Sequence, residues 1–252
     1  MAATLGLLVC SSTPLHAVQV RLLGWTSVDG DLQFDTNQKA TRLKVFPDTF
    51  STVIEFNGDA PITLYKMVDH EGKPRKQTAC TIVVPPGMER GLLVLMPGDD
   101  TKAADRKVLP DESGFVSAGA PLIYNYIWFD DSHKARPSGI LEFRNLSCLP
   151  IALQVDQSQL VLAPQAKAQV PLTPGAKRMP FRAAAQINGQ WKLFRSNPLS
   201  TRSPERMLVI LRDASAALQN DARDGEPNIM MISLFDWPLP APNSKALTVA
   251  RQ

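Results

Sequence analysis

Short runs of alternating apolar and polar residues dominate this sequence. Ile54 and Phe56 alternate with Val53, Glu55 and Asn57, which indicates a strand with one face in solvent. Similar segments, rich in β-branched or aromatic residues and separated by turn residues about every eight to twelve positions, are VQVRLL, TVIEFN, ITLYKM, CTIVV, LEFRN, IALQV, LVLA, FRAAAQI and QWKLF. Helical periodicity is nearly absent, so the pattern predicts an all-β protein.

Turn residues between these segments predict hairpins. Asn188-Gly189 separates RAAAQI from QWKLF, and both residues accept the positive φ angles that a type I′ turn requires. Residues 70–74, with the sequence HEGKP, occupy a comparable place earlier in the chain. We expect a longer turn there.

A proline, a Glu-Arg pair and an apolar run occur twice, in PPGMERGLLVLM at 85–96 and in TRSPERMLVILR at 201–212. Other segments correspond in the same order: VRL with LEF, LQFD with LQVD, and PLIYNYIWFDD with PNIMMISLFDW. Collinear order across the chain indicates duplication of one β unit. We interpret each Glu-Arg pair as the turn entering a strand that is buried on both faces. The alternative is a recognition motif displayed twice.

The repeat predicts a domain organisation of two tandem antiparallel β-sandwiches of immunoglobulin-like type, because about seven or eight strands per unit leave no room for crossover helices. The expected segments are a signal peptide at 1–17, a first unit at 18–136, a linker at 137–139, a second unit at 139–238 and a flexible C-terminal tail at 239–252. Pro137 and Gly139 are the residue types expected at such a joint.

The N-terminal residues predict export. The segment from Ala2 to Val9 is apolar except for one threonine, and small Ala17 lies at a plausible cleavage site. The alternative is a short buried strand or helix. A lipoprotein anchor at Cys10 is less favoured, because Val9 stands where a small residue is needed. The expected location is secreted, periplasmic or in the cell envelope.

Composition narrows the classes of partner. The chain has 252 residues and a formal net charge of +3, with basic and acidic residues interspersed. A nucleic-acid interface would require clustered basic residues, so no nucleic-acid partner is expected. No later apolar run approaches the roughly 20 residues that span a bilayer, so no membrane span is expected.

Cys80 and Cys148 remain if the signal peptide is removed. A disulfide between them is possible in an oxidising compartment. Buried thiols are the favoured interpretation, since the two residues lie far apart in the sequence.

Catalytic and metal-binding motifs are sparse, and we expect no catalytic, cofactor-binding or metal site. Beyond the signal peptide the histidines are His70 and His133, and neither a nucleophile elbow nor a phosphate-binding loop occurs. Asp29-Gly30-Asp31 with Asp35 resembles part of a calcium loop but lacks its full spacing, so a turn is favoured. The acidic residues of 99–112 are interspersed with basic ones, which is typical of a solvated loop.

Tyr124, Tyr126 and Trp128 lie at every second position of one predicted strand, so they share a face. An exposed row of this kind could bind a carbohydrate or a protein. Packing in the core or at a domain interface is the favoured alternative, since the second copy has apolar residues at the same positions.

The segment LEFRNLSCLPIALQVDQSQLVLAPQAKAQVPL, residues 141–172, resembles uncharacterised secreted bacterial proteins with two tandem β-sandwich-like units. That resemblance implies no activity. The sequence thus favours an exported non-catalytic structural or binding protein, whose partner would be a protein, a glycan or an envelope component. The alternative is a carbohydrate-active hydrolase with an acidic site assembled between the two units.

Overall fold

The computed structural model describes residues 17–25, 32–36, 39–57, 61–70, 73–97, 124–201, 205–214 and 226–236. All regular secondary structure in these ranges is β-strand, which confirms the all-β prediction. Within them, no helix is long and apolar enough to cross a membrane. Residues 1–16 of the predicted signal peptide, the charged loop at 99–112 and the predicted tail at 239–252 lie outside the described residues.

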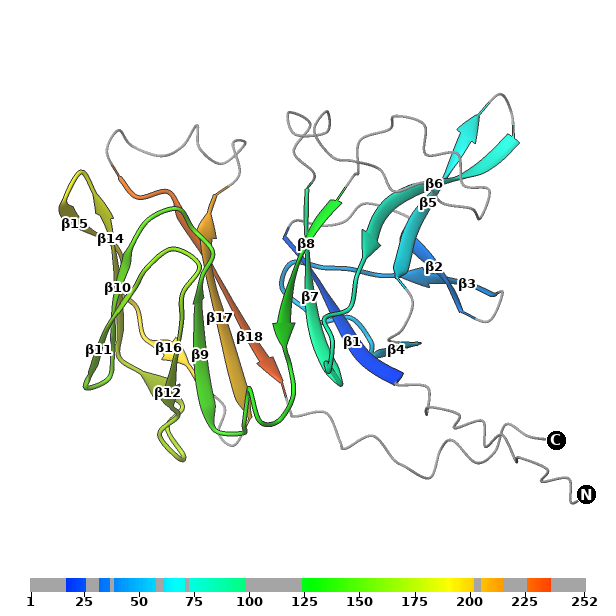
Figure 1. Cartoon of the computed structure of the whole chain (residues 1–252). Helices are drawn as coiled ribbons and strands as arrows, with labels where there is room; N and C mark the ends of the chain where they lie inside the picture. Colours follow the sequence, from blue (N-terminus) through cyan, green and yellow to red (C-terminus); the bar gives the residue numbers. More distant parts are fainter. Residues whose placement is uncertain are drawn as a thin grey trace, which may run out of the picture. The chain divides into compact units, whose positions relative to one another are not determined.

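The described chain divides into two compact units (Figure 1). Unit 1 holds the described residues up to Phe46 and those from Phe50 to Phe129, while unit 2 holds Pro47–Thr49 and the described residues from Asp130 onward. The expected linker at 137–139 therefore belongs to unit 2.

Each unit contains two four-stranded sheets. The strands of unit 1 are β1 (Ala17–Gly24), β2 (Leu32–Thr36), β3 (Lys39–Leu43), β4 (Ile54–Asn57), β5 (Ile62–His70), β6 (Lys73–Ile82), β7 (Arg90–Pro97) and β8 (Tyr124–Asp130). The strands of unit 2 are β9 (Ile140–Asn145), β10 (Ile151–Val155), β11 (Ser158–Leu162), β12 (Lys167–Pro171), β13 (Arg178–Met179), β14 (Phe181–Ile187), β15 (Gln190–Arg195), β16 (Leu199–Ser200), β17 (Arg206–Asp213) and β18 (Ile229–Asp236).

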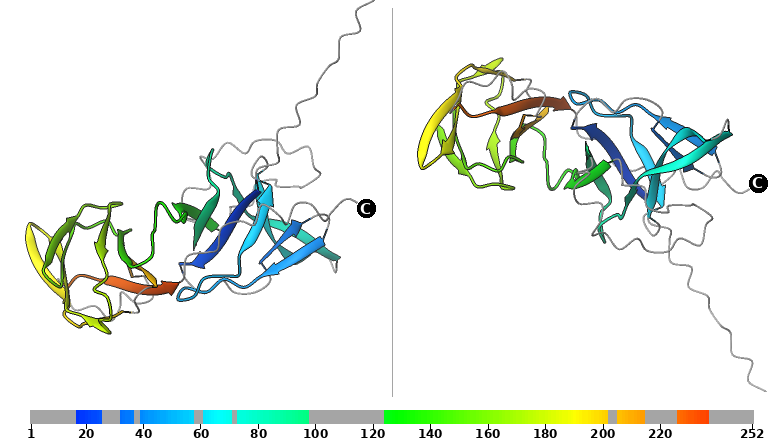
Figure 2. Two further views of the ribbon diagram at one scale, coloured as in Figure 1. Left: turned by 90° about the horizontal axis from the view of Figure 1, so that it is seen from below. Right: turned by 90° about the horizontal axis from the view of Figure 1, so that it is seen from above.

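Strand order is the same in both units. Unit 1 has sheet A, in the order β4-β1-β7-β8, and sheet B, in the order β3-β2-β5-β6. Unit 2 has sheet C, in the order β12-β9-β17-β18, and sheet D, in the order β11-β10-β14-β15, with β13 and β16 as a small additional pair. The sheets of each unit face one another in a sandwich-like arrangement (Figure 2).

One strand pair in each unit departs from the antiparallel expectation. β1 is parallel to β7, and β9 is parallel to β17. Parallel pairing requires a long connection. In unit 1 the chain forms β4 and the strands of sheet B between β1 and β7. The prediction of wholly antiparallel sheets was therefore wrong for this central pair.

Strand register places the repeated segments at equivalent positions. Leu22 pairs with Leu93 in unit 1, and Phe143 pairs with Val209 in unit 2. The first residue of each pair comes from the corresponding VRL and LEF segments, and the second follows its Glu-Arg pair by the same number of residues. The Glu-Arg pairs thus mark the start of equivalent strands.

A separate hydrophobic core lies between the two sheets of each unit. In unit 2, the core combines Phe143 and Val209 of sheet C with Leu153 and Phe181 of sheet D, and the rings of Phe143 and Phe181 stack with centroids 5.9 Å apart. Full burial of such a side chain contributes about 1.5–3 kcal/mol. These inward positions decide which side chains of sheet D remain on its outer face.

The predicted Asn-Gly turn is present between β14 and β15. Asn188 has φ 50° and Gly189 has φ 78°, and Ile187 pairs with Gln190 across the turn. In unit 1, β5 and β6 form the corresponding hairpin, in which His70 pairs with Lys73. The Asn-Gly turn fixes the register of β15, which forms one border of the candidate site.

Candidate functional site

The outer face of sheet D carries mixed polar and small apolar side chains. On β10, Ile151, Leu153 and Val155 are buried in the core, so Ala152 and Gln154 point outward. The same alternation on the neighbouring strand β14 directs Arg182 and Ala184 outward. The outer surface of this sheet is therefore specified by the period of two along each strand.

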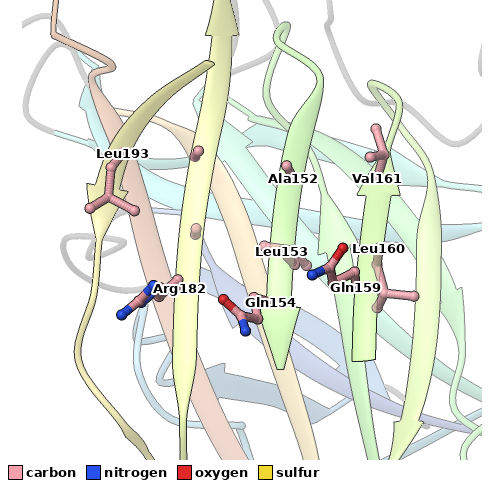
Figure 3. Close-up of a pocket in the computed structure, with 10 residues that line it drawn as sticks. Ala152, Leu153, Gln154, Gln159, Leu160, Val161, Arg182 and Leu193 are labelled. Atoms are coloured by element: carbon pink, nitrogen blue, oxygen red, sulfur yellow. The ribbon is translucent and has the colours of Figure 1, made fainter. Parts of the chain in front are cut away.

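Cross-strand register aligns four of these side chains in one row. Ala152 pairs with Val161 on one side and with Ala184 on the other, and Ala184 pairs with Leu193. The two central alanines are short, whereas Val161 and Leu193 on the border strands are 67% and 60% exposed. The row therefore forms a groove with an alanine floor and aliphatic walls, which we name the sheet D groove (Figure 3).

A polar row lies next to the apolar row. Gln154 pairs with Gln159 and with Arg182, and all three side chains are exposed and line the groove (Figure 3). The structure records no hydrogen bond or ion pair from these three side chains to another described residue. Within the described part of the chain, their donors and acceptors face the groove without a recorded side-chain partner. The groove has a volume of about 450 Å³.

Charge on this sheet has one sign. The four strands of sheet D contain Arg182, Lys192 and Arg195 but no aspartate or glutamate. Trp191, two residues from Leu193 along β15, adds a further apolar side chain that is 45% exposed. The outer face of sheet D consequently combines exposed apolar surface with the positive charge of Arg182.

Sequence analysis did not identify this groove. The alternation in the segments IALQV and FRAAAQI carried the signal, because it places alanine, glutamine and arginine on the outer face. Alignment of these residues into rows depends on register, which becomes visible only in the folded sheet.

The aromatic row predicted from the sequence lies against the core of unit 1. Tyr124 belongs to that core, and Tyr126 and Trp128 are partly buried against it. The Tyr126 hydroxyl accepts a hydrogen bond from the Val83 amide at 3.2 Å, and the Trp128 indole donates to the Val83 carbonyl at 2.9 Å. Gly91 leaves room for the indole ring, since a side chain there would overlap it.

The two cysteines are not joined by a disulfide in the structure. Cys80 is buried in the core of unit 1, as expected for a structural thiol. Cys148 is exposed, so the expectation of burial was wrong for this residue. Its thiol lies 3.6 Å from a carboxylate oxygen of Asp213, and partial burial together with this negative charge raises the pKa of Cys148.

The described part of the calcium-loop candidate is occupied by protein partners. Asp35 accepts hydrogen bonds from the Tyr65 hydroxyl and the Lys76 ammonium, both at 2.6 Å. The bond from Lys76 is the main reason that the pKa of Asp35 is lowered, and Asp35 in turn raises the pKa of Lys76. Residues 29–31 lie outside the described residues, and the described part of the chain contains no cluster of three metal-ligating residues.

The second Glu-Arg pair supplies the centre of a buried ion cluster in unit 2. Arg206, 1% exposed, makes a bidentate pair with Asp236 at 2.9 and 3.0 Å and lies 3.0 Å from an oxygen of Asp131. It also donates to the carbonyl oxygens of Asp131 and Arg136. Arg136 itself pairs with Asp131 at 2.5 Å.

This cluster holds the segment between β8 and β9 against sheet C. Burial lowers the pKa of Arg136, while the nearby Asp131 carboxylate opposes that effect. Gln169 adds a link, donating 2.7 Å hydrogen bonds to the Ala135 carbonyl and to Glu142. With two arginines and two aspartates already paired, the cluster is suited to holding structure rather than to reacting with a ligand.

Comparison with known proteins gives no family assignment. No protein-family model matches the sequence, and no curated protein is significantly similar to it. Function is therefore inferred from the geometry of this chain alone.

Proposed function

We propose that this chain is an exported, non-catalytic binding protein whose ligand contacts the sheet D groove. The observation that carries the proposal is the pairing of exposed aliphatic walls at Val161 and Leu193 with three uncommitted polar side chains in the next row. Specific ligand sites in proteins combine apolar lining with a few placed polar groups in this way.

The size and exposure of the surface favour binding over a purely structural role. A groove of about 450 Å³ lies within the range of roughly 300–1,000 Å³ that is typical of ligand sites. Aliphatic side chains that are more than half exposed contribute little to the core, whereas a ligand that covered them would gain hydrophobic free energy.

Export and domain type are part of the same proposal. The apolar segment from Ala2 to Val9, followed by the plausible cleavage site at Ala17, supports export. The two facing four-stranded sheets of each unit support a sandwich of immunoglobulin-like type, from which the parallel central pair of one sheet is a departure. Both features are common in modules that present a rigid binding surface outside the cell.

The test is a binding screen of the mature protein on glycan and peptide arrays, with matched variants. Leu193→Gln removes one wall, and Ala184→Gln fills the floor without adding charge. Val83→Gln is the control, because Val83 is 61% exposed and lies in unit 1. We expect wild type and the control to bind the same ligands, and both groove variants to lose them.

Ligands that bind all four proteins equally would overturn the proposal. Folding of each variant is checked by circular dichroism before the arrays are compared. This check separates loss of the groove from loss of the sheet.

The non-catalytic part of the proposal has its own test. We expect no turnover of a broad panel of glycosides and esters by the mature chain. Robust hydrolysis that is abolished by substitution of one acidic residue would contradict it and restore the hydrolase alternative.

A further inference from the structure

We infer that the sheet D groove binds an extended peptide segment with an aliphatic side chain and, two residues further along, a carboxylate. This inference rests on the proposed function and names its ligand class. The aliphatic side chain occupies the alanine floor between Val161 and Leu193, and the carboxylate meets Arg182.

Spacing between the two rows supports an extended ligand. Ala152 and Gln154 are two residues apart on β10, and Ala184 and Arg182 are two residues apart on β14. Two residues of a strand span about 6.6–6.8 Å, with both side chains on one face. A peptide in the same extended conformation therefore presents its alternate side chains at the spacing of the apolar and polar rows.

Charge supports a carboxylate as the second group. Arg182 is the one ionisable residue that lines the groove. No acidic residue of the sheet D strands opposes it. A planar guanidinium can pair with a carboxylate through two parallel hydrogen bonds, and Gln154 and Gln159 can donate further bonds.

The groove lining favours a peptide over a glycan. Its walls and floor are aliphatic, and the exposed Trp191 is not among its lining residues. Sugar rings bind well against aromatic faces, whereas aliphatic side chains are complementary to an aliphatic floor. A glycan ligand is therefore an outcome of the test that contradicts the inference.

The experiment uses the full mature chain and a fluorescent peptide, Ser-Thr-Leu-Thr-Glu-Thr-Ser, with both ends blocked. Two companion peptides carry glutamine in place of glutamate, or serine in place of leucine. Fluorescence anisotropy gives the dissociation constants. We expect the glutamine peptide to bind roughly fivefold more weakly, as for loss of an exposed ion pair, and the serine peptide more than tenfold more weakly.

Protein variants connect these preferences to the groove. Arg182→Gln is expected to abolish the preference for glutamate, and Arg182→Glu is expected to favour a peptide with lysine at that position. Arg178→Gln is the matched control, because Arg178 is also exposed but lies on β13, outside the groove. Retained affinity of Arg178→Gln for the glutamate peptide excludes a general effect of net charge.

Outcomes separate this inference from the proposed function. Equal binding of the glutamate and glutamine peptides, or no binding of any peptide, overturns the inference. The proposed function survives either result if another ligand, such as a glycan, is lost with Leu193→Gln. Both fail if no ligand of any class depends on the groove.

Discussion

Replacing Arg206 with methionine tests whether the buried ion cluster holds unit 2 together. The change leaves two carboxylates, Asp131 and Asp236, in a site where their side chains are 0% and 7% exposed. Arg136 can neutralise Asp131, which it already contacts at 2.5 Å, but it lies 3.8 Å from Asp236. Asp236 would lose its bidentate partner and remain buried.

The magnitude follows from that lost partner. Removing one member of a buried pair costs about 3–5 kcal/mol, because the other charge stays desolvated. Arg206→Met also removes hydrogen bonds to the carbonyls of residues 131 and 136. We therefore expect the free energy of unfolding of unit 2 to fall by about 3–5 kcal/mol.

Native-state hydrogen exchange measures this loss separately in each unit. Amides of β9 and β17 in unit 2 should exchange roughly two to four orders of magnitude faster in Arg206→Met, while those of β1 and β7 report on unit 1. Arg178→Met is the control, since Arg178 is exposed and its loss should change stability by less than about 0.5 kcal/mol. A change below about 1 kcal/mol in Arg206→Met would refute the reasoning.

The double variant Arg206→Met with Asp236→Leu tests charge balance. It leaves the pair of Arg136 with Asp131 intact and removes the carboxylate that has lost its bidentate partner. We expect it to recover most of the lost stability, because buried pairs are often replaced by apolar groups at little cost. No recovery would instead assign the loss to the missing carbonyl hydrogen bonds.

Three further predictions concern other contacts. Gly91→Ala should destabilise unit 1 by about 1–3 kcal/mol, because the new methyl group overlaps the indole of Trp128; an unchanged thermal midpoint would contradict this. Asp213→Asn should lower the raised pKa of Cys148 and speed its alkylation severalfold near neutral pH, measured by iodoacetamide labelling against wild type. Because its folded pKa is lowered, Asp35 should stabilise unit 1 fully above pH 3.8, and this contribution should be lost as the pH falls through the folded pKa. The urea denaturation midpoint should therefore fall more steeply with acid in the wild type than in Asp35→Asn, and an equal fall in both proteins would exclude the contribution.

Local sequence signals predicted much of the fold. Alternation and turn residues specify strands and the hairpin at Asn188-Gly189 because both depend on neighbouring residues. The repeated Glu-Arg pairs located β7 and β17 because each precedes a continuous apolar run. The parallel pairing of these strands was not predictable, since their partners lie in distant segments.

Long-range partners also explain why the contacts of single residues could not be named from the sequence. Arg206 contacts Asp236, 30 positions away, and Asp131, 75 positions away. The sheet D groove depends likewise on cross-strand register, which brings Ala152 beside Ala184. Neither arrangement follows from the residue types alone.

The parallel central pair has a consequence for the order in which each unit folds. In sheet A, β1 lies between β4 and β7, so β1 completes its pairing only after β7 has been synthesised. Pairing between strands that are distant in the sequence is slow, and β-rich domains typically fold in about milliseconds to seconds. A chain whose synthesis stopped before Arg90 would expose the side of β1 that normally pairs with β7. An exposed strand edge of this kind can pair with another chain and cause aggregation. We therefore expect unit 1 to complete sheet A only after β7 is made, and unit 2 to complete sheet C only after β17 is made.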